Sequence, residues 1–171
     1  MHSLIILLIY YWLITFSLVG YGILFNQVFL KSSENDIGYV GFYGVFILIL
    51  FSYISSFFIP HTELFNSIIL LIGLINIFIN KEKKILKNNI KKLLTIFFIL
   101  TIFILLAKNH DDFPYYHFPY THLLTEYSNM TGLGNFNHGF RTHSSIFYLS
   151  SLFNLPYSNF FLLHLLSLIH I

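Results

Sequence analysis

Long apolar runs separated by short polar segments make up the first 107 residues of the chain. A helix of about 20 apolar residues crosses a hydrocarbon core of roughly 30 Å. The pattern therefore predicts four membrane-spanning helices, at about residues 4–24, 37–59, 64–79 and 93–107. Pro60 follows the second run, and its ring and missing N–H favour a helix boundary there.

Apolar residues dominate again near the C-terminus, where residues 144–165 are expected to begin further membrane helices interrupted at Pro156. The last six residues, 166–171, read Leu-Ser-Leu-Ile-His-Ile. The transposase end sequence of a common sequencing adaptor encodes these same six residues in one frame. We therefore interpret residues 166–171 as an adaptor artefact that ends an N-terminal fragment, and exclude them from the fold.

A few small and polar residues interrupt the apolar runs. Gly38, Gly41 and Gly44 open the second run at a spacing of three, which places them on one helix face and favours close approach of another helix. Asn66 and Asn76 lie in the third run and are expected to face other helices, because a lipid-facing amide would lack hydrogen-bond partners.

The composition supports the same class of protein. With 56% hydrophobic residues, 9% charged residues and a mean hydropathy of +0.73, the chain could not cover a water-facing surface with polar groups. The predicted fold is an all-α, polytopic transmembrane helical bundle. The absence of cysteine excludes disulfides, cysteine-ligated zinc and thiol catalysis.

The lysines are concentrated in one segment, residues 80–92, and set the expected orientation. Six lysines stand there against the single acid Glu82, so the positive-inside rule places this loop in the cytoplasm. We favour this explanation over nucleic-acid binding. Counting spans then places residues 108–143 on the periplasmic or extracellular face of a multi-pass inner-membrane protein.

Residues 108–143 hold five of the nine histidines and the only arginine. Asp111 and Asp112 stand where the fourth span leaves the membrane. Two adjacent carboxylates repel each other, which prepares one of them to hold a proton as a general base. The alternative is that both acids are solvated residues at a helix end.

The rest of this segment suits a membrane surface. Residues 115–127 predict a short amphipathic surface helix with Phe118, Leu123 and Leu124 available to lipid. Arg141 can bind a phosphate or a carboxylate through two parallel hydrogen bonds, so it is a candidate phosphate ligand. A salt bridge from Arg141 to Asp111 or Asp112 is the competing interpretation.

The histidines of this segment also raise the question of a metal. They are numerous enough to bind zinc together with an aspartate, but no two of them form a His-x-x-x-His or His-Glu-x-x-His unit on one helix. We therefore assign no metal site and interpret most of them as interfacial polar groups. The five are His110, His117, His122, His138 and His143.

Two resemblances bear on function. A multi-span scaffold with an acidic pair at the start of an outward loop, followed by a surface helix, resembles the GT-C class of membrane glycosyltransferases. The motifs Tyr116-His-Phe-Pro, Gly132-Leu-Gly-Asn, Arg141 and Ser144-Ser also look like the motif block of an uncharacterised bacterial family of polytopic membrane proteins.

The GT-C resemblance implies transfer of a sugar from a polyprenyl-phosphate donor at the outer face of the membrane. It implies Asp111 or Asp112 as the base or positioning acid, in some members through a divalent cation. The donor phosphate and substrate would be held by His117, Arg141, Tyr116 and Asn135. The acidic loop here follows the fourth span, whereas in that class it follows the first. The alternative is a non-catalytic transporter or envelope-assembly scaffold, in which residues 108–143 form a gate or a docking surface.

Overall fold

The computed structural model describes residues 2–30, 36–79, 83–106, 111–141, 144–158 and 161–164. These residues form helices joined by turns, with no strand in any of the described ranges, so the predicted all-helical class is confirmed. The α-helices are α1 His2–Phe25, α2 Ile37–Ser56, α3 Glu63–Ile79, α4 Lys83–Leu106, α5 Phe118–Glu126 and α6 Ser145–Ser151.

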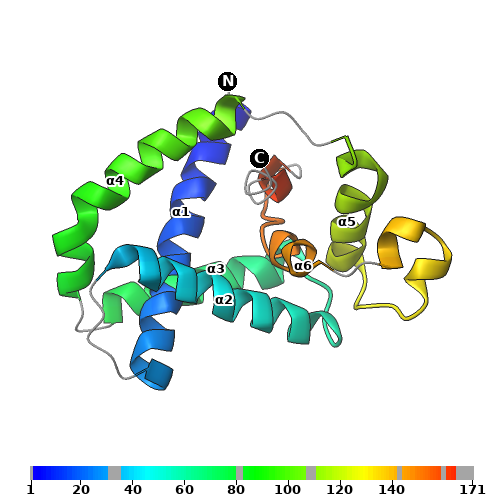
Figure 1. Cartoon of the computed structure of the whole chain (residues 1–171), viewed down its shortest axis with the longest axis horizontal. Coiled ribbons are helices and arrows are strands. Elements are labelled where there is room, and N and C mark those ends of the chain that lie inside the picture. The colour runs from blue at the N-terminus through cyan, green and yellow to red at the C-terminus, as the bar shows by residue number, and fades with distance from the viewer. Residues whose placement is uncertain are drawn as a thin grey trace.

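Helix α1 packs against both α2 and α3, which cross it in Figure 1. It continues into a π-helical turn, η1 Asn26–Leu30. Ile14 of α1 meets Leu48 of α2 and Ile69 of α3 in the main hydrophobic core, which also contains the segment that follows α6. On another part of α1, Val19 and Ile23 pack against the start of α2 and against α4.

Glycines allow the backbones of these helices to touch. Gly44 of α2 lies against the Leu18 carbonyl of α1, and Gly20 of α1 lies against the Gly73 carbonyl of α3, so a Cβ atom at either glycine would collide with the facing backbone. Gly41 has no atom within 4 Å of the position its Cβ would occupy. Of the three predicted packing glycines, Gly44 is therefore the one that meets a facing helix.

Helix α4 begins at Lys83, whereas the expected span began at residue 93. Much of the lysine-rich segment is therefore the first part of a helix and not a loop. No glycine or proline stands in this part of the chain, and lysine is a good helix former, so the helix extends beyond its apolar part. Phe97 then packs on α1, with its ring centroid 3.9 Å from that of Trp12.

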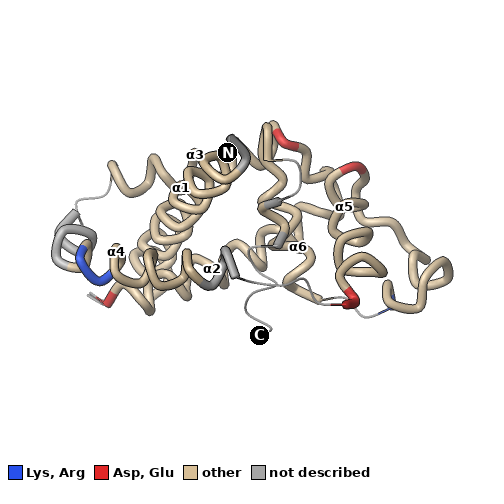
Figure 2. Tube along the Cα trace, turned by 90° about the horizontal axis from the view of Figure 1, so that it is seen from above, with Lys and Arg blue, Asp and Glu red and all other residues tan. Residues whose placement is uncertain are grey.

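Two helices in the described ranges are long and apolar enough to cross a membrane, Leu4–Leu30 and Ile37–Ser56. Helix α3 is apolar but shorter, at 17 residues. Large apolar side chains remain exposed on α2, α3 and α4, among them Phe42, Phe78 and Phe98. In Figure 2 the described lysines lie beside α4 at one end of the molecule, whereas most acidic residues lie toward α5 at the other end.

The histidine-rich segment that also carries Asp111, Asp112 and Arg141 forms a group of short helices around α5. A π-helical turn, η2 Phe113–His117, leads directly into α5, so the predicted short helix is present. Leu124 does not face outward as expected: it is 2% exposed and packs with Tyr120 against α6. Two 3-10 turns follow, η3 Leu133–Asn135 and η4 His138–Arg141.

Helix α6 is short and fills the space between the other helices. The Ser144 side chain caps it by accepting from the Ile146 N–H, and the helix ends at Ser151. Residues 147–155 are all buried. This apolar stretch therefore contributes to the protein core in the described structure; it is followed by turns and by the 3-10 helix η5 Phe161–His164.

The glycine contact gives a direct test of the α1–α2 packing. We expect Gly44→Val to destabilise the fold by about 3 kcal/mol, because the added side chain must push the two backbones apart. Gly41→Val on the same helix is the matched control and should change stability by less than about 1 kcal/mol. Thermal unfolding in detergent measures both; equal losses in the two variants would contradict the backbone contact.

Candidate functional site

Asp112 and Tyr116, two of the predicted site residues, are joined by a hydrogen bond at the start of the α5 region. The Tyr116 hydroxyl donates to Asp112 Oδ2 over 3.2 Å. Burial first, and then this hydrogen bond, raises the pKa of Tyr116. The phenol therefore stays protonated and orients the carboxylate of Asp112, while Asp111 is exposed.

Arg141 and the Gly132-Leu-Gly-Asn motif also come together. Gly132 has a φ of 88°, which favours glycine, and it begins the turn that leads into η3. The Arg141 Nε–H donates to the Gly134 carbonyl over 3.0 Å, and the Arg141 side chain lies so close to Gly134 that a Cβ there would crowd it. The motif thus fixes the stem of an exposed guanidinium.

A second set of contacts ties this turn to Tyr116. Gly139 of η4 lies against the Tyr116 ring, where a Cβ would clash with it. Asn137 donates from Nδ2 to the Tyr115 carbonyl over 3.1 Å and accepts from the Gly139 N–H over 2.9 Å. We call residues 111–141 the motif unit, since these bonds hold Tyr116, the glycine turn and Arg141 in one body.

Two other predicted site residues, His117 and Asn135, also lie in the motif unit, and they differ in burial. His117 is partly buried, and its ring lies over Phe147 of α6 at a centroid distance of 5.0 Å. Asn135 is exposed at the end of η3. Arg141 forms no ion pair with Asp111 or Asp112, both of which are described, so the salt-bridge interpretation is wrong for this structure.

The described ranges contain no group of three or more His, Asp or Glu side chains that could hold a metal ion together. His110 and His143, two of the five histidines considered for zinc, lie outside the described residues, as do residues 165–171 at the proposed adaptor sequence.

The motif unit also presents aromatic side chains to the outside. Phe136, between η3 and η4, is 88% exposed, and Tyr115 is 71% exposed. The Phe136 N–H donates to the Leu133 carbonyl over 3.0 Å, which ties the backbone that carries this ring to η3. Exposed aromatic rings beside a cation are typical of surfaces that meet lipid headgroups.

A buried polar cluster at the corner between α2 and α3 was not predicted from the sequence. His61 is fully buried there, with its Nδ1 bonded to the Ser151 hydroxyl of α6 and its Nε2 to the Ser55 hydroxyl of α2, 2.9 Å away. Burial lowers the pKa of His61 to about 4. The available signal was a histidine directly after a span whose last turns carry Ser52, Ser55 and Ser56.

Asn66 extends this cluster into α3. Its Nδ2 lies within 2.9 Å of three carbonyl oxygens, those of His61, Ser151 and Asn154. This fixes the orientation of the amide, because a flipped amide would place its oxygen against three other oxygens. The prediction that Asn66 and Asn76 face other helices is confirmed, since Asn76 donates to the Gly20 carbonyl of α1.

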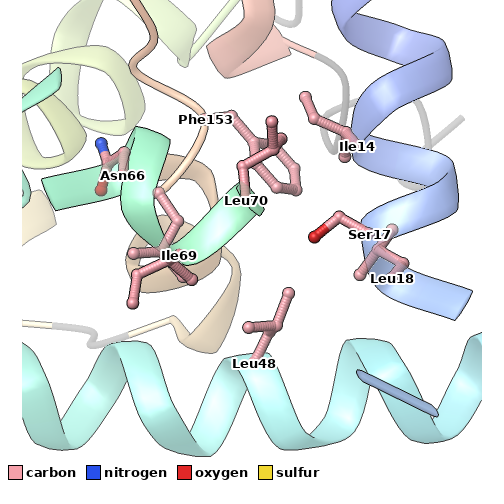
Figure 3. Close-up of a pocket in the computed structure, with 9 residues that line it drawn as sticks. Ile14, Ser17, Leu18, Leu48, Asn66, Ile69, Leu70 and Phe153 are labelled. Atoms are coloured by element: carbon pink, nitrogen blue, oxygen red, sulfur yellow. The ribbon is translucent and has the colours of Figure 1, made fainter. Parts of the chain in front are cut away.

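The remaining atom of the Asn66 amide, Oδ1, is buried and has no partner among the described residues. Asn66 borders a cavity of about 20 Å³, shown in Figure 3, whose other lining side chains come from α1, α2, α3 and the segment after α6. That volume accommodates a single water molecule. Apart from Asn66, only Ser17 offers a polar side chain to the cavity, so it is too small and too apolar to be a substrate site.

The same corner is bonded to the motif unit. The His61 N–H donates to the Leu124 carbonyl of α5 over 2.9 Å, and the Asn129 N–H donates to the Ser56 carbonyl over 2.6 Å. The buried hydroxyls of Tyr120 and Tyr148 are 2.8 Å apart and join α5 to α6. Burial, reinforced by this bond, raises the pKa of Tyr120. The candidate site thus rests on the α2–α3 corner through buried polar bonds.

Residues 4–171 match the family described as Domain of unknown function (DUF8201). The chain belongs to this family. No curated protein and no solved structure matches the chain. The DUF8201 match covers the candidate spans, the α2–α3 corner and the motif unit together, and its description assigns no activity to any of them.

Asn66 provides a test of the corner. We expect Asn66→Ala to destabilise the DUF8201 chain by about 3 kcal/mol, because three buried carbonyl groups lose their donor. Asn135→Ala removes the same amide from an exposed position and should cost less than about 0.5 kcal/mol. Thermal or denaturant unfolding in detergent compares the two; a small effect of Asn66→Ala would show that the corner carries little of the stability.

Proposed function

We propose that this DUF8201 chain is a multi-pass membrane protein that handles a lipid-linked sugar phosphate, as GT-C glycosyltransferases do. In this proposal Arg141 and His117 hold the phosphate, Tyr116 and Asn135 contact the substrate, and Asp112 or Asp111 acts as the base or positioning acid. A divalent cation at the aspartates is compatible with the chemistry of GT-C enzymes.

The observation that carries the proposal is the joining of Arg141 and the Asp112–Tyr116 pair in one body through Gly134, Gly139 and Asn137. A guanidinium with a fixed stem can bind a phosphate at little cost in side-chain entropy. A carboxylate oriented by a phenol in the same unit could position or deprotonate an acceptor hydroxyl. Tyr115 and Phe136 add exposed apolar surface suited to the lipid part of such a substrate.

Membrane placement is supported by two apolar helices of sufficient length and by the distribution of charge. Lys92 of α4 and Asp36, the N-cap of α2, form an ion pair of 3.7 Å. In Figure 2 the described lysines lie at the end of the molecule away from α5. We call this the lysine end. We propose that the lysine end faces the cytoplasm and that the motif unit faces the periplasm or the cell exterior, in the inner membrane.

The chain has no cysteine, so single cysteines can report this orientation. We expect Asn135→Cys to react with a membrane-impermeant maleimide on intact spheroplasts, and Lys92→Cys to react only after the membrane is permeabilised. Both positions are exposed in the fold, which makes them matched reporters. Reaction of both before permeabilisation, or the reverse pattern, would refute the proposed orientation.

Phosphate binding is tested with the chain in lipid nanodiscs and a polyprenyl phosphate as the probe. We expect Arg141→Ala to weaken binding by at least about tenfold, since a charge-assisted pair contributes more than about 1.4 kcal/mol. Arg141→Lys should recover part of the affinity, because it restores the charge but not the two parallel bonds.

Lys92→Ala is the control for the loss of one positive charge, and it should leave the affinity unchanged. Asp112→Asn should leave both phosphate binding and the fold unchanged while abolishing any sugar transfer by the protein. Equal weakening by Arg141→Ala and Lys92→Ala would indicate non-specific attraction. In that case a non-catalytic envelope scaffold or transporter becomes the better description.

A further inference from the structure

We propose that His61 is a proton-operated latch, which holds α6 and the motif unit against the α2–α3 corner while its ring is neutral and releases them when the ring is protonated. The proposal rests on the geometry of the corner and does not depend on the proposed glycosyltransferase activity. It concerns a group that the proposed chemistry does not use.

The hydrogen bonds of the ring define the neutral state. The Ser151 hydroxyl donates to the Tyr148 carbonyl over 2.7 Å, so its oxygen is free to accept from the Nδ1–H of His61. Nε2 is then the acceptor of the neutral ring, and the Ser55 hydroxyl donates to it. In this state a single chain of bonds runs from Ser55 through His61 and Ser151 to the backbone of α6.

Protonation would add a positive charge to the His61 ring, but every N–H and O–H donor of the cluster would still have a hydrogen-bond acceptor. The new Nε2–H would donate to the Ser55 oxygen, and the Ser55 hydroxyl could turn to the Ser52 carbonyl, 3.2 Å away. The cost therefore comes from the buried positive charge and not from a lost hydrogen bond. Water can remove that cost only if the corner opens.

Among the described residues, no negatively charged side chain in the corner would offset the positive charge of a protonated His61 ring. Among the described residues, the two serines are the partners of its nitrogens, and the Phe65 ring stacks on it at a centroid distance of 5.6 Å. Glu63, the nearest acid in sequence, is exposed. Among the described side chains, the titratable groups of the helices packed around the corner are Tyr10, Tyr11 and Tyr21 of α1, Tyr39, Tyr43 and Tyr53 of α2, Glu63 of α3, Tyr120, His122 and Glu126 of α5, and Tyr148 of α6.

The position of His61 makes its charge state matter for the whole motif unit. Its ring bonds α2 to α6, its N–H bonds the α2–α3 corner to α5, and its carbonyl accepts from Asn66 of α3. One residue thus touches four helices. Opening around this ring separates the motif unit from the long helices and leaves the α1–α2 glycine contact intact.

The sign of the pH dependence follows from burial. The pKa of His61 is about 4 in the closed state and about 6.5 when the ring is hydrated, so the open state binds the proton more strongly. The closed state is therefore fully favoured above about pH 6.5 and loses stability as the pH falls toward 4. The equilibrium constant for closing should therefore be about 30-fold smaller at pH 5 than at pH 8.

Hydrogen exchange of the chain in detergent tests the latch. We expect the protection factors of amides 147–155, corrected for the intrinsic pH dependence of exchange, to fall by about 30-fold between pH 8 and pH 5. Those of residues 40–48, at the α1–α2 contact, should change by less than threefold. His61→Gln, which keeps a polar side chain and cannot be protonated, should abolish the pH dependence at residues 147–155.

Three results would overturn the proposal: unchanged protection of residues 147–155 at pH 5, an equal fall at residues 40–48, or a pH dependence that persists in His61→Gln. If His61→Gln does not fold, ¹⁵N-histidine NMR of the unmodified chain decides. The buried imidazole should then show the neutral Nδ1–H form at pH 7 and titrate together with the loss of protection. A ring that is already charged at pH 7, or that titrates without any loss of protection, also refutes the latch.

Discussion

The arrangement of this molecule depends on satisfying polar groups that have no access to water at the α2–α3 corner. The two N–H bonds of the Asn66 amide are shared among three carbonyl groups, and His61 links the serines of two helices. An unpaired buried polar group costs more than a typical hydrogen bond contributes, so these contacts constrain geometry more strongly than apolar packing does. The positions of α5 and α6 relative to the long helices follow from them.

The sequence predicted the all-helical class, and it predicted that Asn66 and Asn76 face other helices, because both conclusions depend on local composition and on the cost of burying an amide. It did not predict where α4 begins, since a helix can extend beyond its apolar part when no glycine or proline stops it. Leu124 was expected to face lipid because apolar periodicity alone cannot distinguish a lipid-facing side from one that packs on protein.

In the candidate site, too, the residue types could be chosen from the sequence, whereas their contacts could not. Tyr116, the Gly132 turn and Arg141 were selected from their chemistry, and their joining through Gly134, Gly139 and Asn137 is a long-range fact that no spacing rule provides. His61 was overlooked because its role depends on Ser151, which is 90 residues away in the chain. Buried polar clusters of this kind are assembled by tertiary structure, and the sequence marks them only as single polar residues near the ends of apolar runs.

The burial of residues 147–155 has a consequence for how the chain is assembled during synthesis. Helices α1, α2 and α3 leave the ribosome before this segment exists, and together they form the walls of the space that it fills. Until the segment arrives, Asn66 lacks two of its three carbonyl acceptors and His61 lacks one of its two serine partners. The early helices therefore form an incomplete receptor with exposed polar groups. That state favours retention at the insertion machinery, or rapid capture of the late segment, over free diffusion in lipid.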